Sequence, residues 1–178
     1  MIYKSNETEK NGCMRIAELM TVAARTAPKA CGVDAIEVIV LDGDDKKKLT
    51  NTMHEIGNET GADFFNRDAG NVDDCHCIVL FGVNTSPRVL DCALCGMKNC
   101  DSAAKDKIPC ALAVTDLGIA VGSAAGIAMD HRTDNRILFS AGMAALRLKL
   151  FPDNVKIIYG IGLSASGKNI FFDRASAE

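Results

Sequence analysis

The stretch that decides the fold is IPCALAVTDLGIAVGSAAGIAM, residues 108–129, an apolar run with Gly118, Gly122 and Gly126 at intervals of four. In a lipid bilayer this glycine spacing lets two helices approach closely. However, Asp116 lies near the middle of the run, and only thirteen uninterrupted apolar residues follow it, whereas a membrane span needs roughly 18 to 20. We therefore predict a buried core helix whose glycines allow a neighbouring helix or a flat ligand to come near.

The segments on either side carry the patterns of further helices and strands. Apolar residues at helical spacing over 7–31 predict a helix that Pro28 ends or kinks. Strands are expected at 35–41, 75–83 and 155–163, and further helices at 44–61 and at about 133–149. Helices outnumber strands, and the connections are too varied for a simple doubly wound sheet. The expected class is α+β, with helices packed on a small central β-sheet.

Composition limits the classes of protein that fit this chain. Its 178 residues include no linker-like tract, so we expect a single domain over 1–178. The net charge is −3, tryptophan is absent and no segment carries a basic stripe. Nucleic acid is therefore not an expected partner, because neither the electrostatic footprint nor a base-stacking platform is present. A membrane is not an expected partner either.

The N-terminal residues and the cysteine count both bear on the compartment. The first twelve residues, MIYKSNETEKNG, are polar and lack the apolar segment of a signal peptide. We therefore expect a cytoplasmic protein. Eight cysteines in such a chain favour thiolate chemistry, a metal or a redox role over a framework of disulfides.

The strongest chemical signal is CALCGMKNCDSAAKDKIPC, residues 92–110, within a cysteine-rich loop expected at about 84–110. Its cysteines follow the pattern C-x2-C-x4-C-x9-C, and the predicted metal ligands are Cys92, Cys95, Cys100 and Cys110. Four thiolates suit either a 4Fe–4S cluster or a structural zinc ion. Three close cysteines with a more distant fourth favour the cluster, because structural zinc is usually bound by two compact C-x2-C-like pairs separated by a spacer. Zinc remains the alternative.

The remaining cysteines are interpreted as packing residues. Cys75 and Cys77 alternate along a strand and so face one side of it. Small buried hydrophobes are the preferred interpretation, with a Cys-His-Cys metal site as the alternative. Cys13 and Cys31 are isolated in the sequence and are assigned to packing.

Two polar motifs also need an interpretation. GLSASGKN, residues 162–169, has the spacing of a phosphate-binding loop, but Asn169 replaces the Ser or Thr that would bind Mg²⁺, and too few residues follow for the required helix and strand. We expect a turn after a strand instead. DHRTDNR, residues 130–136, is expected to join two helices, with Thr133 or Asp134 as N-cap; a catalytic His131 is the alternative.

Several stretches together resemble the uncharacterised bacterial and archaeal family described as ferredoxin-domain-containing proteins. They are AELMTVAARTAPKACGVD (17–34), FFNRDAGNV (64–72), CALCG (92–96), DLGIAVGSA (116–124), DHRTDNRI (130–137) and GLSASGKNIFFDR (162–174). The resemblance runs over nearly the whole chain. It implies that the four cysteines of the loop are ligands of a 4Fe–4S centre, but it implies no substrate.

A fainter similarity is to the nitroreductase fold. AARTAPKACGVDAIEVIVL (23–41) is similar to a segment of that fold in which a helix leads into a strand, and DLGIAVGSAAGIAM (116–129) is similar to its central helix. The similarity implies a homodimer that holds FMN between its subunits. The cations expected near the FMN phosphate are Arg25, Lys29, Lys168 and Arg174. The chain departs from the pattern because Lys29 stands where serine is usual.

The expected function is that of a redox protein that carries one 4Fe–4S cluster, with FMN as an optional second cofactor, and transfers electrons to or from a small molecule or an electron-transfer partner. One alternative is a zinc-stapled structural or interaction module without catalysis. The other is an FMN-dependent, nitroreductase-like reductase in which the cysteines only stabilise a loop.

Overall fold

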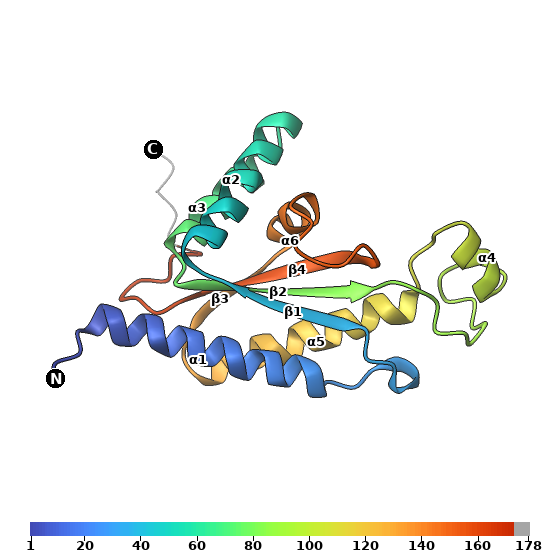
Figure 1. Ribbon diagram of the computed structural model, residues 1–178, viewed down its shortest axis with the longest axis horizontal. Helices are drawn as coiled ribbons and strands as arrows, with labels where there is room; N and C mark the ends of the chain where they lie inside the picture. Colours follow the sequence, from blue (N-terminus) through green and yellow to red (C-terminus); the bar gives the residue numbers. More distant parts are fainter. Residues whose placement is uncertain (173–178) are drawn as a thin grey trace.

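Four antiparallel strands form a single sheet in the order β1-β2-β4-β3 (Figure 1). The computed structural model describes residues 1–172. The strands are β1 (Ile36–Leu41), β2 (Cys77–Asn84), β3 (Asp134–Leu138) and β4 (Val155–Ser164). We call the end of the sheet that holds Ile36, Asn84 and Val155 the cysteine end, because the cysteine loop begins there, and the opposite end the far end.

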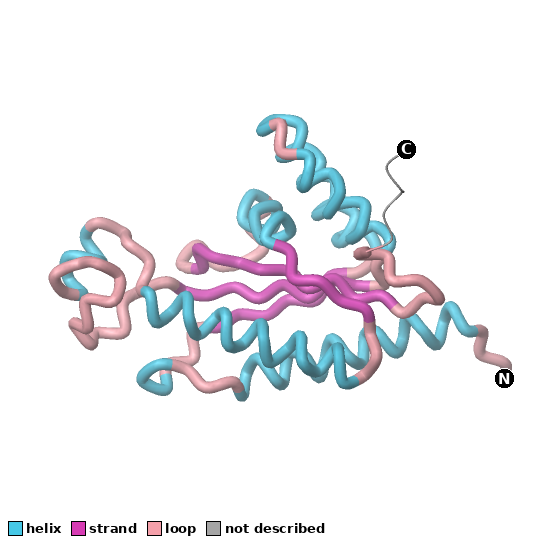
Figure 2. Tube along the Cα trace, turned by 180° about the vertical axis from the view of Figure 1, so that it is seen from behind, coloured by secondary structure: helices cyan, strands magenta, loops and turns pink. Residues whose placement is uncertain are grey.

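Helices cover both faces of this sheet (Figures 1 and 2). They are α1 (Ser5–Thr26), α2 (Gly43–Thr60), α3 (Asp63–Asp74), α4 (Cys100–Lys105), α5 (Ala111–Asp130) and α6 (Phe139–Arg147), with a 3₁₀ turn at Ala30–Gly32. Helices α1 and α5 lie on one face, and α2, α3 and α6 lie on the other, while α4 projects beyond the cysteine end. The predicted α+β class with helices on a small sheet is confirmed.

Strand β2 lies at the centre and is buried on both faces. Its side chains alternate, so that Val79 and Phe81 face α1 and α5, whereas Ile78 and Leu80 face α2 and α6. All four side chains are 0% exposed. A strand covered on both sides reads as a continuous apolar run, which is why CIVLFGV was recognisable as a strand from the sequence.

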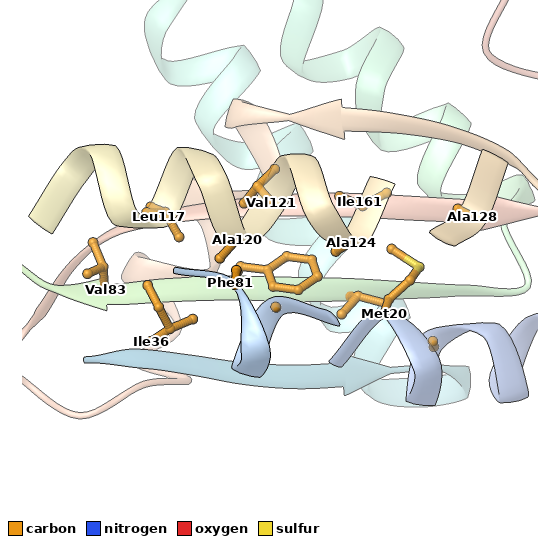
Figure 3. Packing of buried hydrophobic residues seen from close by; sticks show 14 of the residues in the cluster. Met20, Ile36, Phe81, Val83, Leu117, Ala120, Val121, Ala124, Ala128 and Ile161 are labelled. Atoms are coloured by element: carbon orange, nitrogen blue, oxygen red, sulfur yellow. The ribbon is translucent and has the colours of Figure 1, made fainter. Parts of the chain in front are cut away.

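Helix α5 is the core helix that the sequence predicts. Leu117, Ala120, Ala124 and Ala128 recur at helical spacing, are 0% exposed, and pack in the same cluster as Phe81 (Figure 3). By length and composition alone α5 is also long enough to cross a membrane. Its packing against the sheet instead identifies it as the core helix of a globular domain.

The glycines of α5 point away from this core. Gly118 and Gly122 are exposed, and no other part of the described chain lies within 4 Å of where a Cβ on either would stand. Helix α1 therefore does not approach α5 through the glycines. The predicted close neighbour at this stripe is not supplied by residues 1–172 of the same chain.

Helix α6 sits unusually close to β4. A Cβ on Gly142 would stand 1.8 Å from the carbonyl oxygen of Ile158, and a Cβ on Gly160 would stand 2.9 Å from the Cβ of Ala141. Glycine at both positions is therefore what allows the helix to reach the strand. This contact holds the second hydrophobic cluster together on the α2, α3 and α6 face.

Three helices end in Schellman motifs that carry a basic residue where glycine is usual. After α4, the N–H of Lys107 donates to Ala104 O (3.2 Å) and that of Ile108 donates to Ala103 O (2.9 Å). Arg132 and Lys149 occupy the same position after α5 and α6, and the φ angles of the three basic residues are 56°, 57° and 53°. The positive charge at each helix C-terminus offsets part of the cost of a left-handed backbone.

Three parts of the chain differ from the sequence prediction. One is α4, which forms inside the segment expected to be a loop over about 84–110. The segment expected to be one helix over about 133–149 consists of strand β3 followed by α6, and residues 131–133 turn from a helix into a strand. Thr133 and Asp134 are therefore not helix N-caps. Helix α3 was not predicted at all, although its buried residues Phe65, Ala69 and Val72 have helical spacing.

Candidate metal centre

The cysteine loop connects the end of β2 to the start of α5 and extends beyond the cysteine end of the sheet (Figures 1 and 2). All four predicted ligands line one small cavity of about 10 Å³ within this loop, namely Cys92, Cys95, Cys100 and Cys110. Cys92 is exposed, Cys95 and Cys100 are half-buried, and Cys110 is buried. The structure therefore brings to one place four residues that span nineteen positions of the sequence.

Cys110 occupies the N-cap position of α5. Burial alone would raise the pKa of its thiol, but the backbone N–H groups of Ala113, Arg88 and Leu112 and the Arg88 charge outweigh burial and lower the pKa below the ordinary value. Unpaired N–H groups at a helix N-terminus favour an anion. These contacts favour the thiolate form of Cys110, which is the form that binds metals.

Cys100 is held by a reciprocal pair of contacts with Asp91. The N–H of Asp91 donates to the Cys100 sulfur at 3.4 Å, and the N–H of Cys100 donates to Asp91 Oδ1 at 2.6 Å. Cys100 begins α4, and the Asn99 side chain caps that helix by accepting the N–H of Ser102 at 2.9 Å. A cysteine sulfur that accepts a backbone N–H bond is typical of iron–sulfur sites, where such bonds tune the potential.

The backbone between Arg88 and Gly96 takes an unusual conformation. Val89, Asp91 and Ala93 have φ angles of 56°, 47° and 59°, so left-handed residues occur at every second position. Each costs of order 1 to 3 kcal/mol, and Val89 is β-branched, which makes its positive φ rarer still. Left-handed residues are a component of the backbone nests that bind phosphates and Fe–S centres in other proteins.

A buried ion pair fastens the loop to the core. Arg88 Nη2 lies 3.6 Å from Asp116 Oδ2, and the two side chains are 4% and 5% exposed. Asp116 Oδ1 also accepts the N–H of Ala30 at 2.8 Å, which ties the 3₁₀ turn to α5. Asp116 Oδ2 and two nitrogens of Arg88 have no hydrogen-bond partner in the structure.

This pair was missed by the sequence analysis. The signal for Asp116 was present, since a carboxylate inside an apolar helix needs a partner, but Arg88 carries no local signal. The backbone N–H of Arg88 donates to the Cys110 sulfur. The ion pair therefore lies beside the cavity that Cys110 lines.

The four sulfur atoms nevertheless do not surround a single point. Among residues 1–172, no three side chains of His, Cys, Asp or Glu are arranged closely enough to hold one ion. The cysteines share a cavity, and the assignment of all four as ligands of one centre stays a prediction.

Arg25 and Lys29, two of the predicted FMN contacts, lie near the C-terminus of α1. Arg25 pairs with Asp34 at 2.5 Å, and both residues are partly exposed. The Lys29 ammonium is buried and donates to the carbonyls of Ala24, Arg25 and Ala27 at 3.0, 2.7 and 2.8 Å. These bonds use all three of its N–H groups, so a phosphate contact would require the loss of one of them.

Lys168 lies elsewhere, in the turn that follows β4 at the far end of the sheet. Arg174 falls outside the described residues. Within one chain the structure therefore does not bring Lys168 together with Arg25 and Lys29. No helix follows β4 in the described part of the chain, which agrees with the prediction that residues 162–169 are not a phosphate-binding loop.

The other cysteines divide into two groups. Cys13, Cys75 and Cys77 are buried, and burial raises the pKa of their thiols to about 11, 12 and 12. They are neutral packing residues, as predicted. Cys31 is exposed, so its assignment to packing was wrong. His131 is also exposed, and its catalytic role stays a prediction.

Solved structures with a similar fold include nitroreductases. A nitroreductase from Desulfitobacterium hafniense, described with bound FMN, is 15% identical, and the match covers 94% of this chain and 81% of that one with a TM-score of 0.59. Nitroreductase A from Vibrio parahaemolyticus is 13% identical with a TM-score of 0.57, and the match covers 87% of this chain. The chain spans only 59% of that protein's length. These matches define the class as a nitroreductase-like α+β fold.

Sequence comparison gives the family. Residues 107–174 match a family described as an uncharacterised protein containing a ferredoxin domain. An uncharacterised protein from Archaeoglobus fulgidus is 34% identical over 184 residues, with 98% of each chain covered. The chain belongs to this ferredoxin-domain family. The matched segment includes Cys110 but begins after the other three cysteines of the loop.

Proposed function

We propose that this chain is a redox protein that carries a 4Fe–4S cluster on Cys92, Cys95, Cys100 and Cys110 and moves electrons to or from a small molecule or a partner protein. The ferredoxin domain of its family supports a redox role. When bound, the cluster would supply one-electron transfer. The chain's own residues would position that group, donate N–H bonds to its sulfurs and limit its contact with water.

The observation that carries this proposal is that four cysteines line one cavity at the N-terminus of α5. The donor set fits an anionic cluster, because Cys110 and Cys100 accept backbone N–H groups. The loop also carries left-handed residues of the kind found in anion-binding nests. Arg88 adds a buried positive charge next to Cys110. Positive charge and N–H donors both stabilise the more negative, reduced state of such a group.

A zinc-stapled module without catalysis is the second candidate. The specific observation in its favour is the size of the cavity, about 10 Å³, which is close to the volume that holds one water molecule. A single ion held by four thiolates needs less rearrangement of the loop than a cluster does. The left-handed residues of the loop and the buried Arg88 favour the cluster, because a structural zinc site needs neither.

FMN and a second subunit are proposed together. The FMN proposal is supported only by fold, through the D. hafniense nitroreductase described with that ligand. Arg25 and Lys29 lie at one end of the sheet and Lys168 at the other, so one chain does not form the phosphate site. A homodimer is the arrangement in which the two ends can meet. The exposed glycine face of α5 is the surface that we propose for it, since it lets a second helix approach closely.

The compartment proposed is the cytoplasm. None of the eight cysteines forms a disulfide, which fits a compartment that keeps thiols reduced. A cluster with an exposed ligand such as Cys92 also requires protection from oxidation.

The test of the proposed function is metal analysis of protein purified anaerobically. Iron and acid-labile sulfide, with broad absorption near roughly 400 nm, support the cluster. Zinc without colour supports the structural module, and resolved flavin bands support FMN. Cys95→Ser should remove the iron absorption. Cys31→Ser should leave it unchanged, because Cys31 lies outside the cavity and a serine hydroxyl can replace its thiol as a donor to the Arg88 carbonyl. Iron that survives Cys95→Ser would refute the ligand assignment.

The homodimer is tested separately by light scattering. Gly118→Leu places a large side chain on the exposed face of α5 and should give a monomer. Gly70→Leu makes the same change on the exposed side of α3 and should leave a dimer. A monomeric unsubstituted protein, or a dimer that tolerates Gly118→Leu, would contradict the proposed interface.

A further inference from the structure

A second cavity, of about 470 Å³, opens on another side of the cysteine loop. It lies between the loop and the first residues of β4, and one wall is apolar, built from Pro87, Ala103, Ile108 and Pro109. Its volume falls in the range of small-molecule sites, roughly 300 to 1,000 Å³. The cavity is therefore large enough for a small organic ligand, which the space among the cysteines is not.

The charges around this cavity all have the same sign. Lys107 and Lys156 line it, and no aspartate or glutamate does. Neither lysine forms an ion pair with a carboxylate in the described part of the chain. Asn154, Thr85 and Ser86 add groups that can donate hydrogen bonds. An apolar wall with a cationic rim suits a ligand that has an apolar body and an acidic group.

Lys107 stands at a position where a lysine is unfavourable. It follows α4 with a φ of 56°, in the Schellman position that glycine normally occupies. Glycine would adopt this backbone without strain, so the lysine side chain is retained at a cost in stability. Sparsely populated backbone conformations of this kind cluster at ligand-binding sites.

The cavity is also a direct neighbour of the cysteines. Pro87 and Ala103 line both this cavity and the small cavity that the four cysteines line. A ligand in the larger cavity would therefore be separated from the cysteines by the thickness of a single residue.

We propose that this cavity binds a small organic carboxylate, with Lys107 and Lys156 pairing with the carboxylate and the apolar wall covering the rest of the molecule. The role of that carboxylate as the substrate of the redox centre rests on the proposed function. Its binding does not, because none of the contacts involves a cysteine.

The test uses benzoate as the probe and benzamide as its neutral counterpart. Binding is followed by NMR on the purified full-length protein, through the backbone amides of Ala104 and Ile108. Benzoate should shift these amides and bind at least about fivefold more tightly than benzamide. One exposed charge pair contributes up to about 1 kcal/mol, a factor of about five, and two lysines line the cavity. Lys107→Gly should weaken benzoate binding by about fivefold, and the double variant Lys107→Gly with Lys156→Ala by more than tenfold.

Lys107→Gly separates binding from folding, because it relieves the left-handed lysine and should raise the denaturation midpoint while it weakens binding. Arg132→Gly is the matched control: it makes the same change at the same position of a Schellman motif, at the far end of the sheet. That variant should bind benzoate as the unsubstituted protein does.

Two results would overturn the proposal: a double variant that binds benzoate within twofold of the unsubstituted protein, or benzamide binding as tightly as benzoate. Iron content is measured on the same samples. Benzoate binding without iron would refute the proposed function alone, and iron without benzoate binding would refute this proposal alone.

Discussion

Removal of the Asp116 carboxylate should loosen the cysteine loop from the core. Asp116→Ala leaves the Arg88 guanidinium buried with no opposite charge, and two of its nitrogens already lack hydrogen-bond partners. Breaking a buried ion pair by removing one partner costs about 3 to 5 kcal/mol. The N–H of Ala30 also loses its acceptor, but it is only partly buried and water can replace the carboxylate.

The expected loss in the free energy of unfolding is about 3 kcal/mol, at the lower end of that range because the pair is 3.6 Å apart and makes no hydrogen bond. A domain of this size has a total of about 5 to 15 kcal/mol, so the loss is large. Replacing both partners, by Asp116→Leu with Arg88→Met, should recover most of it because no buried charge then remains.

The assay is urea unfolding followed by far-UV circular dichroism, under reducing conditions and with the slope m checked for each variant. Asp34→Ala is the control, since it removes a carboxylate from a partly exposed pair with Arg25 and should cost no more than about 1 kcal/mol. The reasoning is refuted if Asp116→Ala costs less than 1 kcal/mol, or if the double variant is no more stable than the single one.

Two further predictions concern the core. Gly142→Ala should cost at least about 3 kcal/mol by the same assay, because the new Cβ would stand 1.8 Å from the Ile158 carbonyl oxygen. Gly70→Ala, in open space on α3, should instead add about 0.5 to 1 kcal/mol. Equal effects would contradict the close helix–strand contact. Burial raises the pKa of Cys77 from 9.0 to about 12, so this thiol ionises at lower pH in the unfolded chain than in the folded one. Its contribution to the free energy of unfolding is complete below pH 9 and should fall as the pH rises towards 12. The loss should be up to about 1.4 kcal/mol per pH unit. Cys77→Ala should show a shallower alkaline decline, and an unchanged slope would count against the buried neutral thiol.

Those helices and strands were predictable whose apolar residues follow a pattern that can be recognised within the element itself. CIVLFGV is apolar without interruption because β2 is covered on both faces, and the alanines of α5 recur at helical spacing. Strand β3 was not predictable in the same way. It is short and lies at the edge of the sheet, its burial is incomplete, and the pairing with β4 that makes it a strand is invisible to local patterns.

The candidate site was predictable only in part, for a related reason. The spacing of the cysteines identified the loop, because residues close in sequence must share a small volume. Arg88 was missed because its role depends on Asp116, twenty-eight positions away in the sequence. Of the cations grouped for FMN, Arg25 and Lys29 lie at one end of the sheet and Lys168 at the other. Their positions depend on how the strands and helices are arranged, which local sequence patterns do not show.

The most direct test of the account is the ratio of iron to protein in an anaerobic preparation, measured for the unsubstituted chain and for Cys110→Ser. The account predicts close to four iron atoms per chain for a 4Fe–4S cluster, and a large loss when the buried N-cap thiol of α5 is replaced. A preparation that contains zinc and no iron, or iron that Cys110→Ser leaves unchanged, would contradict the claim that these cysteines hold an iron–sulfur centre.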